Sequence, residues 1–213
     1  MGYLAGMDGS LLRQHPRLIP VLGDDSVDVR RARLLEGMTR AVYEKGYAAA
    51  TVADAVRHAR VSRGTFYELF ASKEACFLEA YAHGVDVLVE RVRAAVEGAP
   101  DWRAGLEAGL AAYLDTLATE PLFARSYMLE VNAAGPTAQA ARDAALRRFA
   151  KRYGASFAAS ELGVPSEDTL FVLAAGVDQL VCAHVRAHGP DGLPGLLPAL
   201  LEAALTVSRG SKE

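Results

Sequence analysis

The side chains best suited to specific chemistry lie in one short stretch of the chain. Ser62, Thr65 and Tyr67 carry hydroxyl groups there. Arg63 and Lys73 add two positive charges. Cationic and hydroxyl side chains donate hydrogen bonds to phosphate oxygens, and from a helix they also reach base edges in a nucleic-acid groove. These residue types therefore point to recognition of a polyanion.

A helix over residues 63–70 would sort this stretch into two faces. At about 100° per residue, Phe66, Leu69 and Phe70 form a narrow apolar wedge that we expect in the core. The opposite face, which a major groove would meet, holds Gly64, Thr65, Tyr67 and Glu68, with Arg63 on its flank. The carboxylate of Glu68 is repelled by phosphates but can accept a hydrogen bond from a cytosine amino group, so either effect is open.

Three further helices would position this segment. From Arg30 onward apolar residues recur at helical spacing until Gly46, which predicts a first amphipathic helix. Thr51 and Asp54 have the spacing of a shortened capping box and start a second helix that reaches about Ala59.

Ser62 is an N-cap residue for the helix over residues 63–70, and Ser72 is one for a long helix that runs toward Gly98. Two short helices joined by a tight turn and braced by longer ones form a helix-turn-helix unit. Lys73 and Thr51, each at a helix start, are candidate phosphate clamps.

The Gly, Pro and capping residues in the rest of the chain divide it into segments that all predict helices. They span residues 101–120, 121–134, 136–162, 166–188 and 193–208, with no alternating strand pattern and no repeat. The fold class is therefore all-α with about nine helices. With 213 residues, of which 51% are hydrophobic and 23% are charged, the composition is that of a globular protein with its own core.

The segment around residues 63–70 resembles the DNA-binding segment of the TetR family of bacterial transcription regulators. The resemblance covers roughly residues 30–80, and its most specific part is Val61-Ser62-x-Gly64-Thr65-x-Tyr67-x-x-Phe70-x-Ser72-Lys73-Glu74. It implies a homodimer on a palindromic double-stranded operator, a small-molecule effector of unknown identity, and by family habit a repressor. The DNA-binding set is then Thr51, Ser62, Arg63, Gly64, Thr65, Tyr67, Glu68 and Lys73.

Arg60 departs from the family pattern, which usually has glycine at this position. An arginine that keeps a left-handed backbone there would cost about 1–2 kcal/mol, and a phosphate contact is one way to offset that cost.

Charge is distributed unevenly and suggests three regions. We predict a flexible arm at 1–29, a helix-turn-helix DNA-binding domain at 30–75, and a helical effector-binding and dimerisation domain at 76–213. The middle region has nine Lys or Arg residues against five Asp or Glu residues, whereas the whole chain has a formal net charge of −3. A basic segment within an acidic chain fits a polyanionic partner for that segment alone.

In the C-terminal region, aromatic and polar residues are candidates for an effector pocket, although such clusters are more often ordinary core. They are Trp102, Tyr113, Phe123, Tyr127, Met128, Glu130, Phe149 and Tyr153. The helix 166–188 is apolar almost all round and must be covered twice, which predicts a dimer interface shared with the last helix. The predicted interface residues are Phe171, Ala174, Ala175, Asp178, Val181, Val185, Leu197, Leu200, Leu201 and Leu205.

Enzyme interpretations find little support in the sequence. His184 and His188 are four residues apart, but Val185 stands where a metalloprotease helix carries its glutamate. We expect no enzyme activity, no metal and no cofactor. The apolar run that contains Asp178 is too short for a membrane span, and no secretory signal is recognised before Gly23, so we expect a cytoplasmic protein. The alternative function is an all-helical small-molecule binder or enzyme whose helix-turn-helix does not read DNA.

Overall fold

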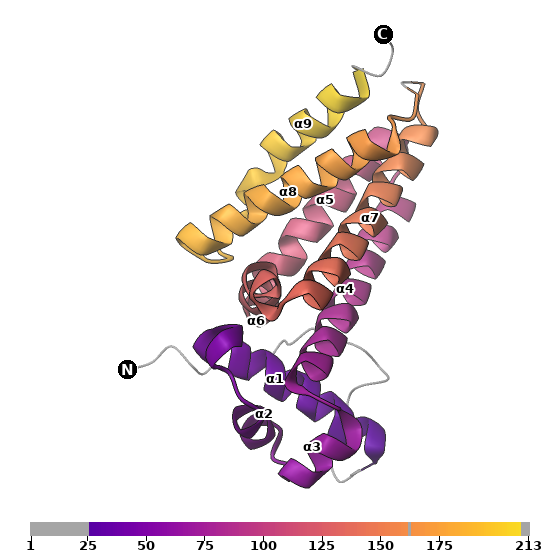
Figure 1. The fold of residues 1–213 in the computed structure, drawn as a ribbon. Helices are drawn as coiled ribbons and strands as arrows, with labels where there is room; N and C mark the ends of the chain where they lie inside the picture. Colours follow the sequence, from indigo (N-terminus) through magenta and orange to yellow (C-terminus); the bar gives the residue numbers. More distant parts are fainter. Residues whose placement is uncertain (1–25, 162, 210–213) are drawn as a thin grey trace. The chain divides into compact units, whose positions relative to one another are not determined.

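The computed structural model describes residues 26–161 and 163–209, and Figure 1 shows them as a set of helices. Nine α-helices and no strand occur among these residues, as the sequence predicts. The first four are α1 (Val27–Ala49), α2 (Val52–Ala59), α3 (Arg63–Leu69) and α4 (Lys73–Glu97). The others are α5 (Trp102–Thr119), α6 (Pro121–Phe123), α7 (Pro136–Ala158), α8 (Glu167–His188) and α9 (Leu197–Arg209). Shorter turns are the π-helical η1 (Ala124–Leu129) and the 3-10 helices η2 (Val131–Ala134) and η3 (Leu193–Leu196).

The described chain divides into two compact units. The N-terminal unit contains residues up to 87 together with 120–138, and the C-terminal unit contains 88–119 and 139 onward. Of the predicted arm at 1–29, residues 1–25 lie outside the described part, and α1 already begins at Val27. The division at residue 75 concerns function and stays a prediction, whereas the compact unit that holds α1–α3 takes in a segment from much later in the chain.

That later segment supplies part of the core of the N-terminal unit. The Tyr127 ring is fully buried, with its centroid 5.2 Å from that of Phe77, 5.9 Å from Tyr81 and 5.1 Å from Phe123. The Phe123 edge occupies the space that a side chain at Gly84 would fill. Segment 120–138 is therefore packed against α4 as core, although it follows α5 in the sequence.

Hydrogen bonds attach the same segment to α1. The hydroxyl groups of Tyr127 and Thr39 lie 2.6 Å apart, and Ser126 donates to the Thr39 carbonyl at 3.0 Å. Near the end of α1, the Tyr47 amide donates to a Glu130 carboxylate oxygen at 2.8 Å. Because buried polar groups are costly without partners, these pairs fix where the segment docks.

Close backbone contact fixes α2 on α1. A Cβ atom added at Gly37 would lie 2.4 Å from the Ala55 carbonyl oxygen and 3.0 Å from the Ala59 nitrogen. Both of these atoms belong to the α2 backbone, so no rotamer change could make room. Gly37 is thus required by the approach of the two helices.

The C-terminal unit is built around α5. Leu110, Leu114 and Leu117 of α5 are buried, and α5 contacts both η3 and α9. Helices α8 and α9 also contact each other and run side by side in the orange and yellow part of Figure 1. Leu200 and Ala204 form the buried face of α9.

Helix α8 is long and apolar enough to cross a membrane by length and composition. In the structure, however, Leu173, Val177 and Val181 are buried in the C-terminal unit. Asp178 is also buried and forms an ion pair with Arg142 of α7. Burial raises the pKa of Asp178, and the Arg142 guanidinium acts in the opposite direction. These are features of a core helix in a globular protein.

Candidate DNA interface

The two faces of α3 are separated as the sequence predicts. Phe66 and Phe70 are buried, and their ring centroids lie 5.6 Å apart. On the opposite face Arg63, Gly64 and Glu68 are exposed, and half of the Tyr67 surface is accessible. The buried rings anchor α3 while its polar face is open to a ligand.

The start of α3 is held by its predicted cap. The Ser62 hydroxyl accepts a hydrogen bond from the Thr65 amide at 2.9 Å and lies 2.9 Å from the Thr65 hydroxyl. One turn later, the Arg63 guanidinium lies over the Tyr67 ring, 5.6 Å from its centroid. These contacts order four predicted DNA-binding residues in one surface, where hydroxyl and guanidinium donors could meet phosphates or base edges.

A buried carboxylate organises the start of α2. Thr51 and Asp54 form the predicted capping box, in which the Asp54 amide donates to the Thr51 hydroxyl at 3.2 Å and the Thr51 amide donates to the Asp54 carboxylate at 3.1 Å. The Thr51 hydroxyl also donates to this carboxylate at 2.8 Å. Lys45 of α1 donates to the same carboxylate at 2.7 Å, and Arg57 approaches it at 3.2 Å. The Lys45 and Thr51 donors hold the pKa of Asp54 well below its usual range. Thr51 is exposed, so its position at the helix start stays a predicted phosphate contact.

The Lys73 ammonium makes contacts that the sequence does not reveal. Its Nζ donates to the carbonyl oxygens of Tyr47 at 2.8 Å and Ala50 at 3.1 Å, and lies 4.1 Å from the centre of the Tyr47 ring. Burial lowers the pKa of Lys73. An ammonium has three donors, so one remains for a phosphate oxygen. Lys73 therefore braces the end of α1, and its phosphate contact stays a prediction.

Arg60 keeps the left-handed backbone that its place in the turn demands. It is the C-cap of α2, with φ 55° and ψ 43°, and it is the one non-glycine residue with positive φ among the described residues. The arginine therefore adopts the left-handed backbone for which we predicted a cost of about 1–2 kcal/mol.

Arg31 was missed by the sequence reasoning, yet it connects three helices. Its guanidinium donates two hydrogen bonds to the Glu79 carboxylate of α4 and lies 4.7 Å from the centre of the Phe70 ring. A further bond of 3.4 Å reaches the Leu69 carbonyl at the end of α3. No local pattern marks this clamp, because its partners lie about forty positions away or more.

The predicted effector residues do not form one cluster within either unit. Phe123 and Tyr127 belong to the core of the N-terminal unit. In the same segment, Glu130 accepts a hydrogen bond from the Tyr47 amide, and Met128 is half-buried. In the C-terminal unit the Tyr113 and Phe149 rings meet edge to face at 5.5 Å, and Tyr153 is half-buried.

Trp102 differs because it lines a cavity. This cavity, of about 330 Å³, lies within the C-terminal unit where the end of α4, the start of α5 and the end of α7 meet. Its lining is Arg93, Val96, Glu97, Ala99, Asp101, Trp102, Gly105, Arg152, Ala155, Ser156 and Ala159.

The structure corrects the side of α8 that is available to a partner. Ala174, Asp178, Val181 and Val185, predicted as interface residues, are buried within the single chain, as is Leu200 of α9. Phe171, Ala175, Leu197, Leu201 and Leu205 are half-buried. An all-apolar helix has no hydrophobic direction in its sequence, so the choice of face was arbitrary.

The outward residues of α8 include Val172, 67% exposed, and Leu180, 40% exposed, with Gly176 and Ala183 on the same side. The histidine pair near the end of α8 has a local explanation. His184 Nε2 lies 2.9 Å from the Asp191 carbonyl oxygen, and its ring lies 5.1 Å from that of His188.

Part of the chain is similar in sequence to known proteins. Residues 34–80 match the model of the family described as "Bacterial regulatory proteins, tetR family". The curated relative HTH-type transcriptional activator FasR of Mycolicibacterium smegmatis is 34% identical over 88 residues. That match covers 41% of this chain, and the chain spans about two fifths of the length of that relative, 40%.

Solved structures share the fold over most of the chain. The fatty acid degradation regulator FadR from Bacillus halodurans superposes with a TM-score of 0.74 at 16% identity, over 83% of this chain and 94% of that one. FadR from Bacillus subtilis, in complex with stearoyl-CoA, gives a TM-score of 0.72 at 16% identity, over 82% and 97%. The match of residues 34–80 to the tetR family model confirms the resemblance seen in the sequence of that segment.

Proposed function

We propose that this chain is a sequence-specific transcription regulator, and more narrowly a repressor that a small-molecule effector releases from a palindromic operator. The supporting observation is α3, whose apolar face is anchored in the core while Arg63, Tyr67 and Glu68 face outward. An α-helix presented in this way fits the major groove of a DNA duplex. A protein that acts on the bacterial chromosome works in the cytoplasm.

Selection of bound sites from random duplexes, with the purified full-length chain, tests the proposal. We expect an enriched sequence with two-fold symmetry. A reporter gene placed behind that sequence then separates a repressor from an activator by the sign of the change in expression. A folded, ligand-free chain that enriches no sequence at low salt would refute DNA reading and favour the small-molecule binder or enzyme.

Three variants distinguish the roles within the interface. Thr65→Ala should change preference at one base step, because its hydroxyl and methyl groups can meet a base edge. Lys73→Ala and Thr51→Ala should weaken binding to every sequence alike, because phosphate contacts carry no sequence information. Equal losses on all sequences for all three variants would remove Thr65 from the reading set.

Lys73 needs a sharper measurement, because the loss of its bonds to Tyr47 and Ala50 could weaken DNA binding indirectly. The salt dependence of the operator affinity separates the two causes. Loss of one phosphate contact lowers the slope of log K against log salt by about 0.9. A purely structural loss lowers the affinity and leaves the slope unchanged, and that result would refute the phosphate contact.

For the homodimer we propose the outward side of α8 as part of the interface. Val172, Gly176, Leu180 and Ala183 recur there at helical spacing and leave apolar surface exposed on a single chain. A two-fold pairing through this side, joined by α9, would present two copies of α3 to one duplex. The half-sites should then be about 34–36 Å apart or a multiple of that distance.

For the effector we propose a site in the C-terminal unit that includes the cavity beside Trp102. Acyl-CoA thioesters are the first class to test, because FadR from Bacillus subtilis, which has this fold, was solved with stearoyl-CoA. Release that weakens operator binding about 1000-fold requires a preference of about 4 kcal/mol for the non-binding state. The effector must therefore make several well-formed contacts.

Trp102 is the single tryptophan of the chain, so its fluorescence reports on this cavity. Titration with acyl-CoAs of increasing chain length should shift the emission and weaken operator binding over the same concentration range. Trp102→Phe should abolish the optical signal while operator release persists. Operator release with no change in Trp102 emission would place the effector site elsewhere.

A further inference from the structure

The backbone changes direction near the end of α1, next to both predicted phosphate contacts. Gly46 has φ 75° and ψ 159°, so α1 is kinked there and one further turn follows. The Ala50 amide donates to the Gly46 carbonyl at 3.0 Å and closes this turn, residues 46–50, which we call the terminal turn. Thr51, the N-cap of α2, is the next residue in the chain.

Side chains from two distant segments hold the terminal turn at its two ends. At its start the Tyr47 amide donates to the Glu130 carboxylate at 2.8 Å. At its end Lys73 donates to the carbonyl oxygens of Tyr47 at 2.8 Å and Ala50 at 3.1 Å. Free amides make the start of a helical turn positive, and free carbonyls make its end negative. The carboxylate and the ammonium therefore each lie at the end that they stabilise.

The Glu130 carboxylate is fitted closely to the backbone of the terminal turn. A Cβ atom at Gly46 would lie 3.2 Å from Glu130 Oε2, so the carboxylate approaches a stretch of bare backbone. Glu130 is half-buried, and within the described part of the chain it forms no ion pair. Its hydrogen bond to the Tyr47 amide is therefore the polar contact that holds this side chain in place.

Aromatic packing attaches the terminal turn to segment 120–138 a second time. The buried Tyr47 ring lies against Phe77 of α4, with the ring centroids 4.8 Å apart, and the Phe77 centroid is 5.2 Å from that of Tyr127. Tyr127 and Glu130 belong to the same segment. The backbone and the ring of Tyr47 are both held, so the terminal turn and segment 120–138 pack as one assembly.

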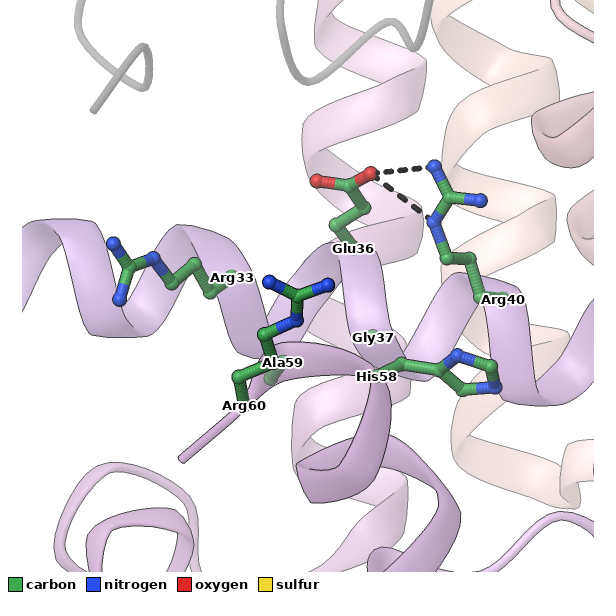
Figure 2. Close-up of a pocket in the computed structure, with 7 residues that line it drawn as sticks. All are labelled: Arg33, Glu36, Gly37, Arg40, His58, Ala59 and Arg60. Carbon is green, nitrogen blue, oxygen red and sulfur yellow. Dashed lines mark hydrogen bonds and ion pairs between the residues drawn. The ribbon is translucent and has the colours of Figure 1, made fainter. Parts of the chain in front are cut away.

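The opposite end of α2 is fixed by other contacts. Figure 2 shows His58 and Ala59 of α2 beside Gly37 of α1, where the two helices cross. A Cβ atom at Gly37 would lie 3.0 Å from the Ala59 nitrogen, and His58 Nε2 lies 3.0 Å from a Glu44 carboxylate oxygen. These contacts hold the second half of α2 on α1 without the terminal turn. The start of α2 follows the terminal turn directly, so a change in the turn displaces Thr51 first.

We propose that Glu130 is a positioning residue for the DNA interface. By holding the Tyr47 amide it sets the orientation of the terminal turn, which carries Thr51 and offers its carbonyl groups to Lys73. The inference rests on the proposed DNA-binding function. It gives Glu130, which the sequence suggested as an effector contact, a different role. A carboxylate that DNA repels would thus strengthen the binding of DNA.

That paradox provides the test, because the charge and the hydrogen bond of Glu130 can be removed separately. Glu130→Ala removes both. Glu130→Gln removes the charge but keeps a carbonyl oxygen that can accept from the Tyr47 amide. Glu107→Ala is the matched control, because Glu107 carries the same charge and is exposed on α5. If charge alone mattered, both Glu130 variants would bind every duplex more tightly than the wild-type chain, since repulsion falls.

The first measurement is the affinity of the full-length chain for the selected operator and for unrelated duplexes. Glu130→Ala should weaken binding about tenfold, because a hydrogen bond to a charged group is lost. The loss should be the same on every sequence, since phosphate contacts carry no sequence information. Glu130→Gln and Glu107→Ala should bind at least as tightly as the wild-type chain.

The second measurement needs no DNA. Amide hydrogen exchange of peptides that cover residues 46–51 should be faster in Glu130→Ala than in the wild-type chain, while peptides of α5 exchange equally in both. Unchanged exchange at 46–51 would show that Glu130 does not hold the terminal turn and would overturn the proposal.

Operator affinity decides the rest. Wild-type affinity or tighter binding in Glu130→Ala overturns the positioning role, and so does an equal loss in Glu130→Gln, which keeps the acceptor. A wild-type chain that selects no operator refutes the proposed function itself and removes the DNA role of Glu130 with it. In that case the exchange data still show whether Glu130 holds the terminal turn, so the two failures are distinguishable.

Discussion

Replacement of Gly37 by alanine should open the contact between α1 and α2. The added Cβ would lie 2.4 Å from the Ala55 carbonyl oxygen, where ordinary contacts begin above 3 Å, so α2 would have to move by nearly 1 Å. Overpacking of this kind costs about 1–3 kcal/mol, and the better helix propensity of alanine returns about 1 kcal/mol. We expect a net loss of up to about 2 kcal/mol, and a loss of about 1.4 kcal/mol would be a tenfold increase in local opening.

Amide hydrogen exchange read from peptides of α2 measures this opening in the full-length chain. It is preferable to a global unfolding curve, because a chain with two compact units need not unfold in one step. Gly64→Ala is the matched control, since the nearest atom to its added Cβ, the Ser62 hydroxyl oxygen, is 3.5 Å away. Exchange in the control should be unchanged or slower. Equal protection of α2 in the wild-type chain and in Gly37→Ala would refute the argument that backbone contact sets the distance between the helices.

Three other changes test separate parts of the structure. In the folded chain Lys45 and Thr51 keep the pKa of Asp54 low, so its stabilising contribution is present above the unfolded pKa of about 4 and is lost as the pH falls below it. Asp54→Asn should therefore show a smaller fall in thermal midpoint between pH 5 and pH 3 than the wild-type chain, and an equal fall would count against this role. Arg31→Lys keeps the charge but loses the paired bonds to Glu79, so α3 should lose about 1 kcal/mol of protection against hydrogen exchange; unchanged exchange in α3 would show that the clamp does not hold it. Leu180→Glu should weaken the dimer at least tenfold in sedimentation experiments while leaving the thermal midpoint of the monomer unchanged, and a dimer of wild-type affinity would exclude the outward side of α8.

Local signals in the sequence predicted the helix starts of α2, α3 and α4 well. The capping residues Thr51, Ser62 and Ser72 each act on an amide three positions away, so their roles can be seen in a window of four residues. The buried wedge of α3 follows from helical periodicity alone. The left-handed turn at Arg60 was left open by the sequence, because the resemblance supplied only the glycine that usually occupies the position, and the structure shows that the arginine keeps this conformation.

Contacts between distant residues could not be predicted in this way. Lys73 reaches the end of α1, and Arg31 reaches α4, across intervals that carry no periodic signal. The face of α8 was misassigned because apolar residues surround the whole helix, so only packing decides that Val181 is buried and Leu180 is exposed. The effector candidates were chosen by residue type, mainly as aromatics, and packing places Tyr127 and Phe123 among them in the core beside α4.

The origin of Tyr127 in a late segment also matters for anyone who recombines proteins of this fold. A chimera that joins residues 26–87 to a foreign sensor would leave behind 120–138, and with it the ring that covers Phe77 and the partner of Thr39. The transplanted segment would then expose apolar surface, and the Thr39 hydroxyl would keep only its hydrogen bond to the Leu35 carbonyl oxygen. A chimera that carries both segments, with breakpoints near residues 87, 120 and 138, keeps the N-terminal compact unit whole.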